Sequence, residues 1–238
     1  ILYHSPKTYR VIRKLLTLPG PSTLATFVRN RLGDMQSGIN PTILNLLKIR
    51  CSLMKEINRK CSLVFDEMSI KTHLDYNKAT DSITGLCEDG SRADHALVLM
   101  ARGLSVKWKQ PLGYIFTHGT VKATKLAEII KTAIEKLQTI GLDVRCTVCD
   151  QGPKNVSALK ILGFTVPSPF WTHPTTNRKI YTIFDGPHLI KNIRNNLTRH
   201  DIVTSDGGKV SWKYIRQMHD IDNRNKLRLC PKLKKSHL

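Results

Sequence analysis

The chain has 238 residues, with 38 Lys or Arg against 18 Asp or Glu, so its formal net charge is +20. This basic excess favours a polyanion through counterion release, with nucleic acid ahead of an anionic membrane surface. No apolar run approaches the roughly 20 residues of a membrane span, so we expect no membrane segment, and we find no signal peptide. Six cysteines in a chain this long do not form a disulfide framework, which indicates a reducing, intracellular compartment.

The positive charge is concentrated towards both ends of the chain. Residues 1–60 hold 11 basic and 2 acidic side chains, and residues 186–238 hold 12 and 4. Residues 61–185 are nearly balanced, with 15 against 12. We therefore expect the two flanks to contact DNA, with a solvated basic surface as the alternative. Lys55, Arg59 and Lys60 are candidate phosphate contacts.

Residues 1–50 are basic and carry helical apolar spacing. Ser5 and Pro6 predict the start of a first helix, and Ser22 or Thr23 is the expected cap of a second. Pro41 marks the start of a third. The sequence therefore predicts an N-terminal helical segment.

The middle of the chain alternates between strand-like and helix-like patterns. Three strand-like runs are followed by a helix, a fourth strand and another helix, an order that predicts a mixed sheet covered by helices. The apolar face of the first of these helices fits a core, with the interface of a homo-oligomer as the alternative. The strands are expected at 61–70, 94–104, 111–117 and 142–150, and the helices at 122–139 and 154–162.

Two carboxylates, Asp66 and Asp150, each follow an apolar strand-like run. If the two strands are parallel neighbours, both acids lie at their carboxyl ends and face one crevice. Hard oxygen ligands of this kind suit Mg²⁺ or Mn²⁺, which support phosphoryl transfer. The alternative is that acids at strand ends are common in any α/β protein.

Cys146 and Cys149 have the spacing of a zinc-binding pair, but they lie within the expected strand 142–150. Residues three apart in a strand face opposite sides, and no second pair of ligands follows. We therefore interpret both as small buried hydrophobic residues.

Five short motifs run through the chain in a fixed order: 5–9 (SPKTY), 18–24 (LPGPSTL), 65–70 (FDEMSI), 149–152 (CDQG) and 184–197 (FDGPHLIKNIRNNL). In this order they resemble the P-element transposase family, including its vertebrate relatives that carry a THAP domain. The last motif is the most specific of the five. The resemblance covers nearly the whole chain.

The resemblance implies a ribonuclease H-like fold and a set of functional residues. Asp66 and Asp150 match the first two acids of the family's Asp-Asp-Glu catalytic set, which uses Mg²⁺ (or Mn²⁺) to cut transposon ends and join them to target DNA in the nucleus. Asp185 and Lys191 match positions associated with guanine nucleotide, which makes GTP the expected second cofactor. From the residues alone, Asp185 reads as a helix cap and Lys191 as part of a solvated face.

The resemblance also implies a division of the chain: an N-terminal basic helical segment (1–55), the first part of a ribonuclease H-like domain (56–184) and the start of a mainly helical GTP-binding insertion (185–238). The family's third acid falls beyond residue 238, and the zinc-binding DNA reader lacks its Cys and His spacing here. The chain is thus expected to be a fragment or a truncated domesticated relative.

Three functions stay open at this point. The first is the catalytic core of a DNA transposase, and the second is an inactive DNA-binding module that has kept the fold. The third is an independent nuclease that completes its site with Glu67, Asp75 or Asp81. A regular P-loop GTPase is excluded because its phosphate-binding motif is missing.

Overall fold

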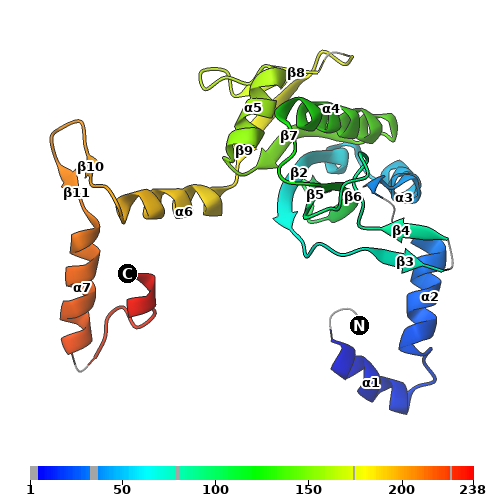
Figure 1. The fold of residues 1–238 in the computed structure, drawn as a ribbon, viewed down its shortest axis with the longest axis horizontal. Helices are drawn as coiled ribbons and strands as arrows, with labels where there is room; N and C mark the ends of the chain where they lie inside the picture. The colour runs from blue at the N-terminus through cyan, green and yellow to red at the C-terminus, as the bar shows by residue number, and fades with distance from the viewer. Residues whose placement is uncertain (1–4, 33–36, 79–80, 174, 226) are drawn as a thin grey trace. The chain divides into compact units, whose positions relative to one another are not determined.

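The computed structural model describes residues 5–32, 37–78, 81–173, 175–225 and 227–238 (Figure 1). The chain forms two compact units. Residues 1–149 and 153–183 form the first, which we call the sheet unit, and residues 150–152 and 184–238 form the second, the C-terminal unit. No helix of the described residues is long and apolar enough to cross a membrane.

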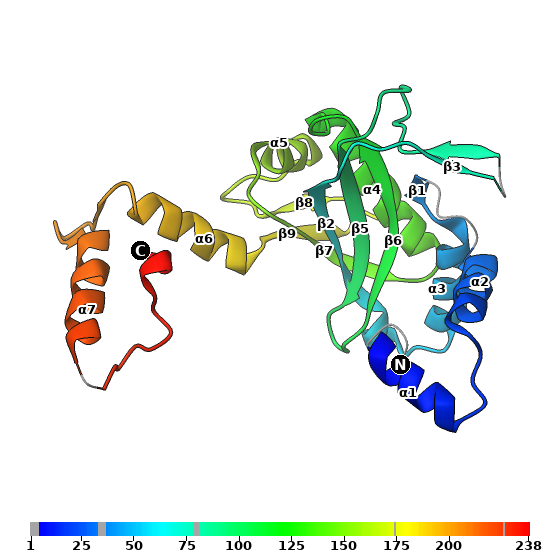
Figure 2. The same cartoon turned by 60° about the horizontal axis from the view of Figure 1, so that its bottom comes forward.

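The sheet unit is built on a seven-stranded sheet of order β1-β6-β5-β2-β7-β9-β8. β2 lies at the centre, antiparallel to β5 and parallel to β7. Figure 2 shows β2, β5 and β6 side by side in this sheet. The mixed sheet predicted from the sequence is confirmed. The four predicted strands are β2 (Lys60–Ser69), β5 (His95–Gly103), β6 (Lys109–Thr117) and β7 (Asp143–Cys149).

The two central strands form because their apolar side chains are buried. Leu63 and Phe65 of β2 and Val144 of β7 are at most 1% exposed. Near-continuous apolar runs are typical of parallel strands that are covered on both faces. Burial of these side chains therefore stabilises the β2–β7 pair.

Helix α4 (Ala123–Thr139) supplies most of the helical core and contacts α5 (Pro153–Leu162) and β7. It ends before Gly141, whose φ of 91° lies in the left-handed region that glycine favours. The core interpretation of its apolar face is confirmed, since every predicted residue of that face is buried: Leu126, Ile129, Ile130, Ala133, Ile134 and Leu137.

Three helices precede the central strand β2: α1 (Pro6–Leu15), α2 (Pro21–Leu32) and α3 (Pro41–Ser52). The predicted starts of α1 and α3 at a proline are confirmed. The expected cap of α2 at Ser22 or Thr23 is wrong, because the helix already begins at Pro21 and both residues lie inside it. The N–H of Leu24 donates to the carbonyl of Gly20, so the chain is already helical at the proline.

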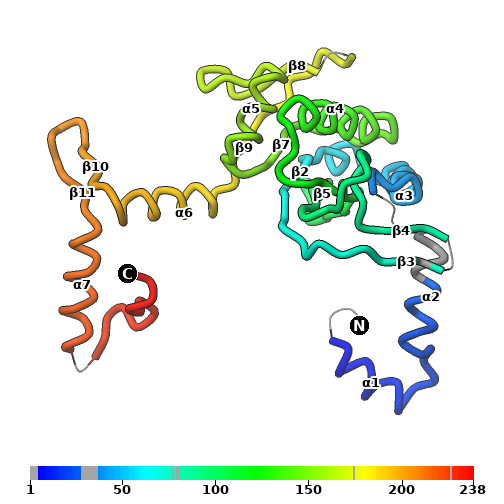
Figure 3. The backbone as a smooth tube through the Cα atoms, in the orientation of Figure 1, coloured from blue at the N-terminus to red at the C-terminus, as the bar shows by residue number. Residues whose placement is uncertain are grey.

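Short elements that the sequence did not predict complete the sheet unit. They are β1 (Gly38–Ile39), the hairpin β3 (Asp75–Asn77) and β4 (Ser82–Thr84), β8 (Phe170–Thr172), β9 (Lys179–Phe184) and the 3₁₀ turn η1 (Glu56–Arg59). Figure 3 traces the backbone of β3 and β4. β1 pairs with β6 where a Cβ on Gly113 would overlap the carbonyl of Gly38, so this pairing requires glycine at position 113.

The C-terminal unit contains α6 (Gly186–Leu197), the hairpin β10 (Ile202–Val203) and β11 (Lys209–Val210), α7 (Trp212–Arg224) and the short η2 (Lys235–His237). No residue of α6 is buried, and only His219 and Asp222 are buried in α7. The described residues of this unit therefore form no apolar core of the kind that holds the sheet unit together.

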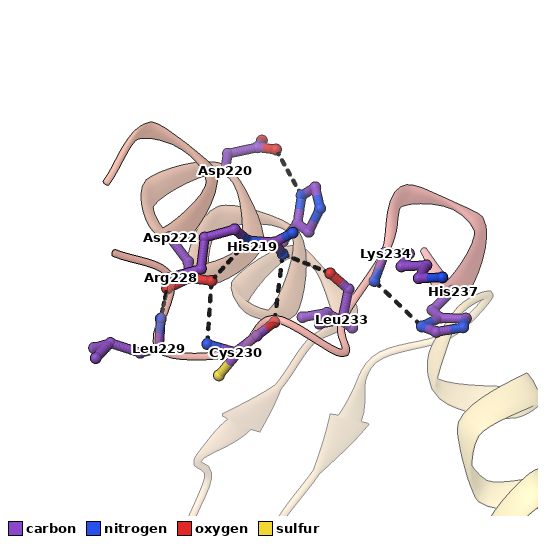
Figure 4. Close-up of polar contacts among 9 residues, drawn as sticks. All are labelled: His219, Asp220, Asp222, Arg228, Leu229, Cys230, Leu233, Lys234 and His237. Atoms are coloured by element: carbon purple, nitrogen blue, oxygen red, sulfur yellow. Dashed lines mark hydrogen bonds and ion pairs between the residues drawn. The ribbon is translucent and has the colours of Figure 1, made fainter. Parts of the chain in front are cut away.

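A buried carboxylate organises the segment that follows α7 (Figure 4). Asp222 accepts hydrogen bonds from the N–H groups of Leu229 (2.7 Å) and Cys230 (3.2 Å) and from Arg228 Nε (3.3 Å). Arg228 in turn donates to the carbonyls of Cys230 and Leu233. We call Asp222 and Arg228 the loop clamp.

Candidate functional site

Asp66 lies within β2, opposite Val98 of β5, and its side chain is exposed. Its Oδ1 accepts a hydrogen bond of 2.9 Å from the N–H of Glu67. The expectation that Asp66 lies at the end of its strand is wrong. Residues 67–69 remain paired with β5, and β2 runs to Ser69.

Asp150 directly follows Cys149, the last residue of β7, as the sequence predicts. Its side chain is half-buried, and its Oδ1 accepts a hydrogen bond of 2.8 Å from the N–H of Gly152. This local turn begins the loop that leads into α5.

The pairing of β2 with β7 relates the two acids. Leu63 pairs with Thr147, and Val64 pairs with Val148, so paired residues are 84 positions apart in the chain. Asp66 and Asp150 are also 84 positions apart. Two aspartates supply the hard oxygen donors that Mg²⁺ and Mn²⁺ prefer, so the donor set fits such an ion.

Glu67 and Asp81, two of the three further acids considered for an independent nuclease, have side-chain partners of their own, and Asp75 lies in a separate hairpin. Glu67 follows Asp66 in a strand, so its side chain faces the other side of the sheet, where Oε1 accepts from Thr117 Oγ1 at 3.2 Å. Asp75 and Asp81 belong to the β3–β4 hairpin, and Asp81 accepts from the Tyr76 hydroxyl at 2.6 Å. Within the described ranges, no group of three or more His, Cys, Asp or Glu residues could hold a metal ion.

A polar network that the sequence did not predict fixes the end of β2. His95 Nδ1 lies 2.8 Å from Asp94 Oδ1 and its Nε2 lies 3.1 Å from Ser69 Oγ. The N–H of Gly119 also donates to Asp94 at 2.7 Å. The hydrogen bond from His95, aided by the one from Gly119, lowers the pKa of the Asp94 carboxyl. The neighbouring Asp94 and His95 were the available signal, but their partners lie at distant positions in the sequence.

The cysteines support the interpretation given above. Cys146 and Cys149 are buried, at 4% and 3% exposure. Burial raises the pKa of the Cys146 thiol, and it raises that of Cys61 to about 12. Thiols of this kind are poor metal ligands and poor nucleophiles at neutral pH.

The three candidate DNA contacts lie at the amino end of β2. Lys55 precedes η1, Arg59 Nε donates to the carbonyl of Met54 at 3.1 Å, and Lys60 is the first residue of β2. Lys60 lies six residues before Asp66, which is about 20 Å along a strand. These residues therefore do not touch Asp66, and they could contact only a different part of a bound DNA.

Asp185 is the N-cap of α6, as the sequence suggested. Its Oδ2 accepts from the N–H of His188 at 3.3 Å and lies 2.6 Å from His188 Nδ1. Lys191 lies one turn further along α6 and is exposed. The two residues thus share one helix, with the acid at its amino end.

Comparison with known proteins identifies the class. Residues 35–163 match the model of the TNP-like RNase H N-terminal domain, and residues 187–238 match that of the TNP-like GTP-binding insertion domain. The chain is therefore of the class in which an RNase H-like domain is followed by a GTP-binding insertion. It belongs to the P-element transposase family.

Individual relatives agree with this assignment. The chain is 26% identical over 228 residues to the human DNA transposase THAP9, a match that covers 90% of this chain and 25% of the relative. It is 25% identical over 236 residues to the Transposable element P transposase of Drosophila melanogaster, covering 98% and 29%. The chain thus spans little more than a quarter of the length of these relatives.

The fold also matches a solved structure. The "Drosophila P element transposase strand transfer complex" superposes with a TM-score of 0.77 and 25% identity over 98% of this chain and 50% of that chain. The RNase H-like fold predicted from the sequence is confirmed by this match and by the family model.

Proposed function

We propose that this chain carries the first two metal-binding acids of a DNA-cutting and DNA-joining transposase, Asp66 and Asp150. The observation that supports the proposal most strongly is the shared spacing of 84 residues between paired positions of β2 and β7 and between the two acids. In parallel strands, residues that lie opposite each other in the register point to the same face of the sheet, so the same register would place the Asp66 and Asp150 side chains side by side. The relatives named as human and Drosophila transposases support DNA as the substrate and, since genomic DNA of such cells is nuclear, the nucleus as its location.

Each part of the chain has a definite role in this proposal. Bound Mg²⁺ or Mn²⁺ would stabilise the charge that develops on the attacking and leaving oxygens of a phosphodiester. Asp66 and Asp150 would hold the ion through oxygen atoms, and the hydrogen bonds from the N–H groups of Glu67 and Gly152 orient their carboxylates. Lys60, about 20 Å from Asp66 along β2, would contact a phosphate roughly six nucleotides from the reacting one, and Lys55 and Arg59 would contact neighbouring phosphates. The third acid would come from outside these residues.

The metal proposal is tested with Mn²⁺ and backbone amide signals. The N–H groups of Glu67 and Gly152 each donate to one of the acids, so Mn²⁺ held by both should broaden both signals in the ¹⁵N-labelled chain. Asp66→Asn or Asp150→Asn should abolish both effects, because each variant removes half of the donor set. Asp75→Asn, in the β3–β4 hairpin, is the matched control and should change nothing. Broadening at Gly152 that survives Asp66→Asn would refute a shared site.

We propose further that residues 185–238 begin a guanine-nucleotide domain in which Asp185 reads the base and Lys191 contacts the phosphates. A carboxylate can accept hydrogen bonds from guanine N1–H and N2–H. If Asp185 binds the base, its carboxylate must accept hydrogen bonds from guanine as well as from the N–H of His188, which its Oδ2 already accepts as the cap of α6. The match to a GTP-binding insertion domain over residues 187–238 supports the nucleotide, and the particular residues are our proposal.

Two substitutions at position 185 separate base reading from capping, when they are measured in a protein that carries a complete insertion domain. Asn is as good an N-cap as Asp, but its amide can donate to the C2 oxygen of xanthine. Asp185→Asn should therefore shift preference from GTP towards XTP. Asp185→Ser keeps a cap and should lose base selection. If the ratio of GTP to XTP affinity is the same in all three proteins, Asp185 only caps the helix.

A further inference from the structure

The pairing of β2 with β7 changes register once along its length. Lys60 pairs with Asp143 and Cys61 with Val144, so these partners are 83 positions apart, whereas Ser62 pairs with Cys146. From Ser62 onwards the separation is 84. The extra residue in β7 is Arg145, which forms a β-bulge. Bulges of this kind change which side chains meet across a strand pair, and they are frequent next to active sites.

Charged side chains surround the bulge on the sheet unit. Asp143 Oδ2 lies 2.8 Å from Arg145 Nε and 2.7 Å from its terminal nitrogen Nη2, and Asp143 Oδ1 lies 3.1 Å from Arg178 Nη1. The side chain of Asp143 is 18% exposed, against 43% for Arg145 and 57% for Arg178. One carboxylate thus holds the bulged residue to its own strand and to the residue just before β9. We call Asp143, Arg145 and Arg178 the bulge clamp.

The surroundings of the bulge clamp leave it room to rearrange. Asp143 and Arg178 line a cavity of about 410 Å³ at the amino end of the central strands, together with Arg59 and Glu56. Asp143 and Arg178 are therefore not enclosed by close packing, and the side chain of Arg145 contacts Asp143 through an ion pair and a hydrogen bond.

The bulge sets which residues of β2 and β7 lie opposite each other between the bulge and the two acids. If the separation of 83 continued past Cys61, Asp66 would be level with Cys149, a core residue that is 3% exposed. Asp150 would be level with Glu67, whose side chain belongs to the opposite face. A slip of one residue exchanges the two faces of a strand. Metal binding by both acids therefore requires the separation of 84.

We infer that the bulge clamp is a positioning device for the metal-binding acids: by holding Arg145 out of the ladder, it sets the register in which Asp66 and Asp150 act together. The inference rests on the proposed function. Asp143, Arg145 and Arg178 touch neither acid, so they act through the strand pairing alone.

Asp143→Asn tests this directly, because it removes the charge that both arginines contact. In the full chain we expect the cross-strand NOEs between Leu63 and Thr147 to weaken and NOEs one residue out of step, between Leu63 and Cys146, to appear. The Mn²⁺ concentration at which the Glu67 and Gly152 signals lose half of their intensity should rise about tenfold. This is the lower end of the loss in metal affinity that follows from removing a group that supports the ligands. Glu88→Gln removes a surface ion pair to Lys125 of α4 and is the control of equal charge change.

Deletion of Arg145 distinguishes register control from general stabilisation. Without Arg145 the pairs Cys61–Val144 and Ser62–Cys146 follow each other directly, so the register at the acids needs no bulge and no clamp. The deletion should therefore restore both the NOEs and the Mn²⁺ response in the Asp143→Asn background. If the clamp only stabilised the fold, the deletion would restore neither the NOEs nor the Mn²⁺ response.

Each result has a definite meaning. Unchanged NOEs and Mn²⁺ response in Asp143→Asn, or failure of the deletion to restore them, would overturn the inference. If Asp143→Asn does not fold, Arg145→Ala is compared with Arg145→Lys, and only the lysine, which can still pair with Asp143, should keep the register. If the wild-type chain shows no Mn²⁺ broadening, the proposed function fails, while the NOE comparison still decides the role of the clamp.

Discussion

The two units of this chain are held together by different forces. In the sheet unit, apolar side chains such as Leu63 of β2, Val144 of β7 and Ile134 of α4 are completely buried. In the C-terminal unit, α6 has no buried residue, and the order of the chain depends on polar contacts such as the Asp185 cap and the loop clamp. Asp66 and strand β7, which leads directly to Asp150, therefore belong to the unit that apolar burial stabilises. The candidate nucleotide residues lie in a part whose order depends on charge.

The largest difference should appear when an apolar side chain is truncated in each unit. Ile134 of α4 is completely buried, so Ile134→Ala should lower the free energy of unfolding by about 2–5 kcal/mol. Ile193 of α6 is 58% exposed, and Ile193→Ala should change it by less than about 0.5 kcal/mol. Urea denaturation of the two variants measures both values. Equal decreases would mean that α6 packs as tightly as α4.

The next comparison concerns the two basic flanks. Replacing Lys55, Arg59 and Lys60 with Ala should weaken binding to double-stranded DNA. It should also flatten the plot of log K against log[salt] by about 0.9 for each phosphate that the variant no longer neutralises. A matched triple in the C-terminal unit, with Arg194, Lys213 and Arg216 changed to Ala, shows which flank binds the phosphates. A slope that is unchanged by the first triple would remove these three residues from the interface.

The smallest expected effect is a response of the loop clamp to acid. Hydrogen bonding by the N–H of Leu229, together with Cys230 and Arg228, lowers the pKa of Asp222. The clamp therefore adds stability that is complete above the unfolded pKa of about 3.9 and is lost as the pH falls through the lower folded value. Amide hydrogen exchange at Leu229 and Cys230 should accelerate in that range relative to the intrinsic rate. Asp222→Asn should flatten this dependence, and Asp220→Asn, on the exposed side of α7, should not.

The sequence was sufficient for the parts of the fold that depend on local patterns. Apolar runs predicted β2, β5, β6 and β7, and helical spacing predicted α4. The resemblance, more than any local pattern, pointed to the family. Short strands such as β1 and β8 escaped prediction because two or three residues carry no periodicity. In addition, β1 pairs with residues of β6 more than 70 positions away.

The same reason limits what could be said of the site. Asp66 and Asp150 were recognisable because each follows an apolar run. The bulge at Arg145 and the contact of Asp94 with Gly119 depend on residues brought together from 25 to more than 80 positions apart. No window of sequence contains both partners of such a contact.

The close approach of β1 to β6 at Gly113 has a consequence for the order of folding. The N–H of Asn40 donates to the carbonyl of Leu112, and the Asn40 side chain caps α3. Because more than 70 residues separate these partners, closing that loop costs more entropy than forming the local β5–β6 hairpin. We expect α3 to dock late, on a hairpin that already exists. Pulse-labelling hydrogen exchange in which the Asn40 amide is protected before the amides of β5 and β6 would contradict this order.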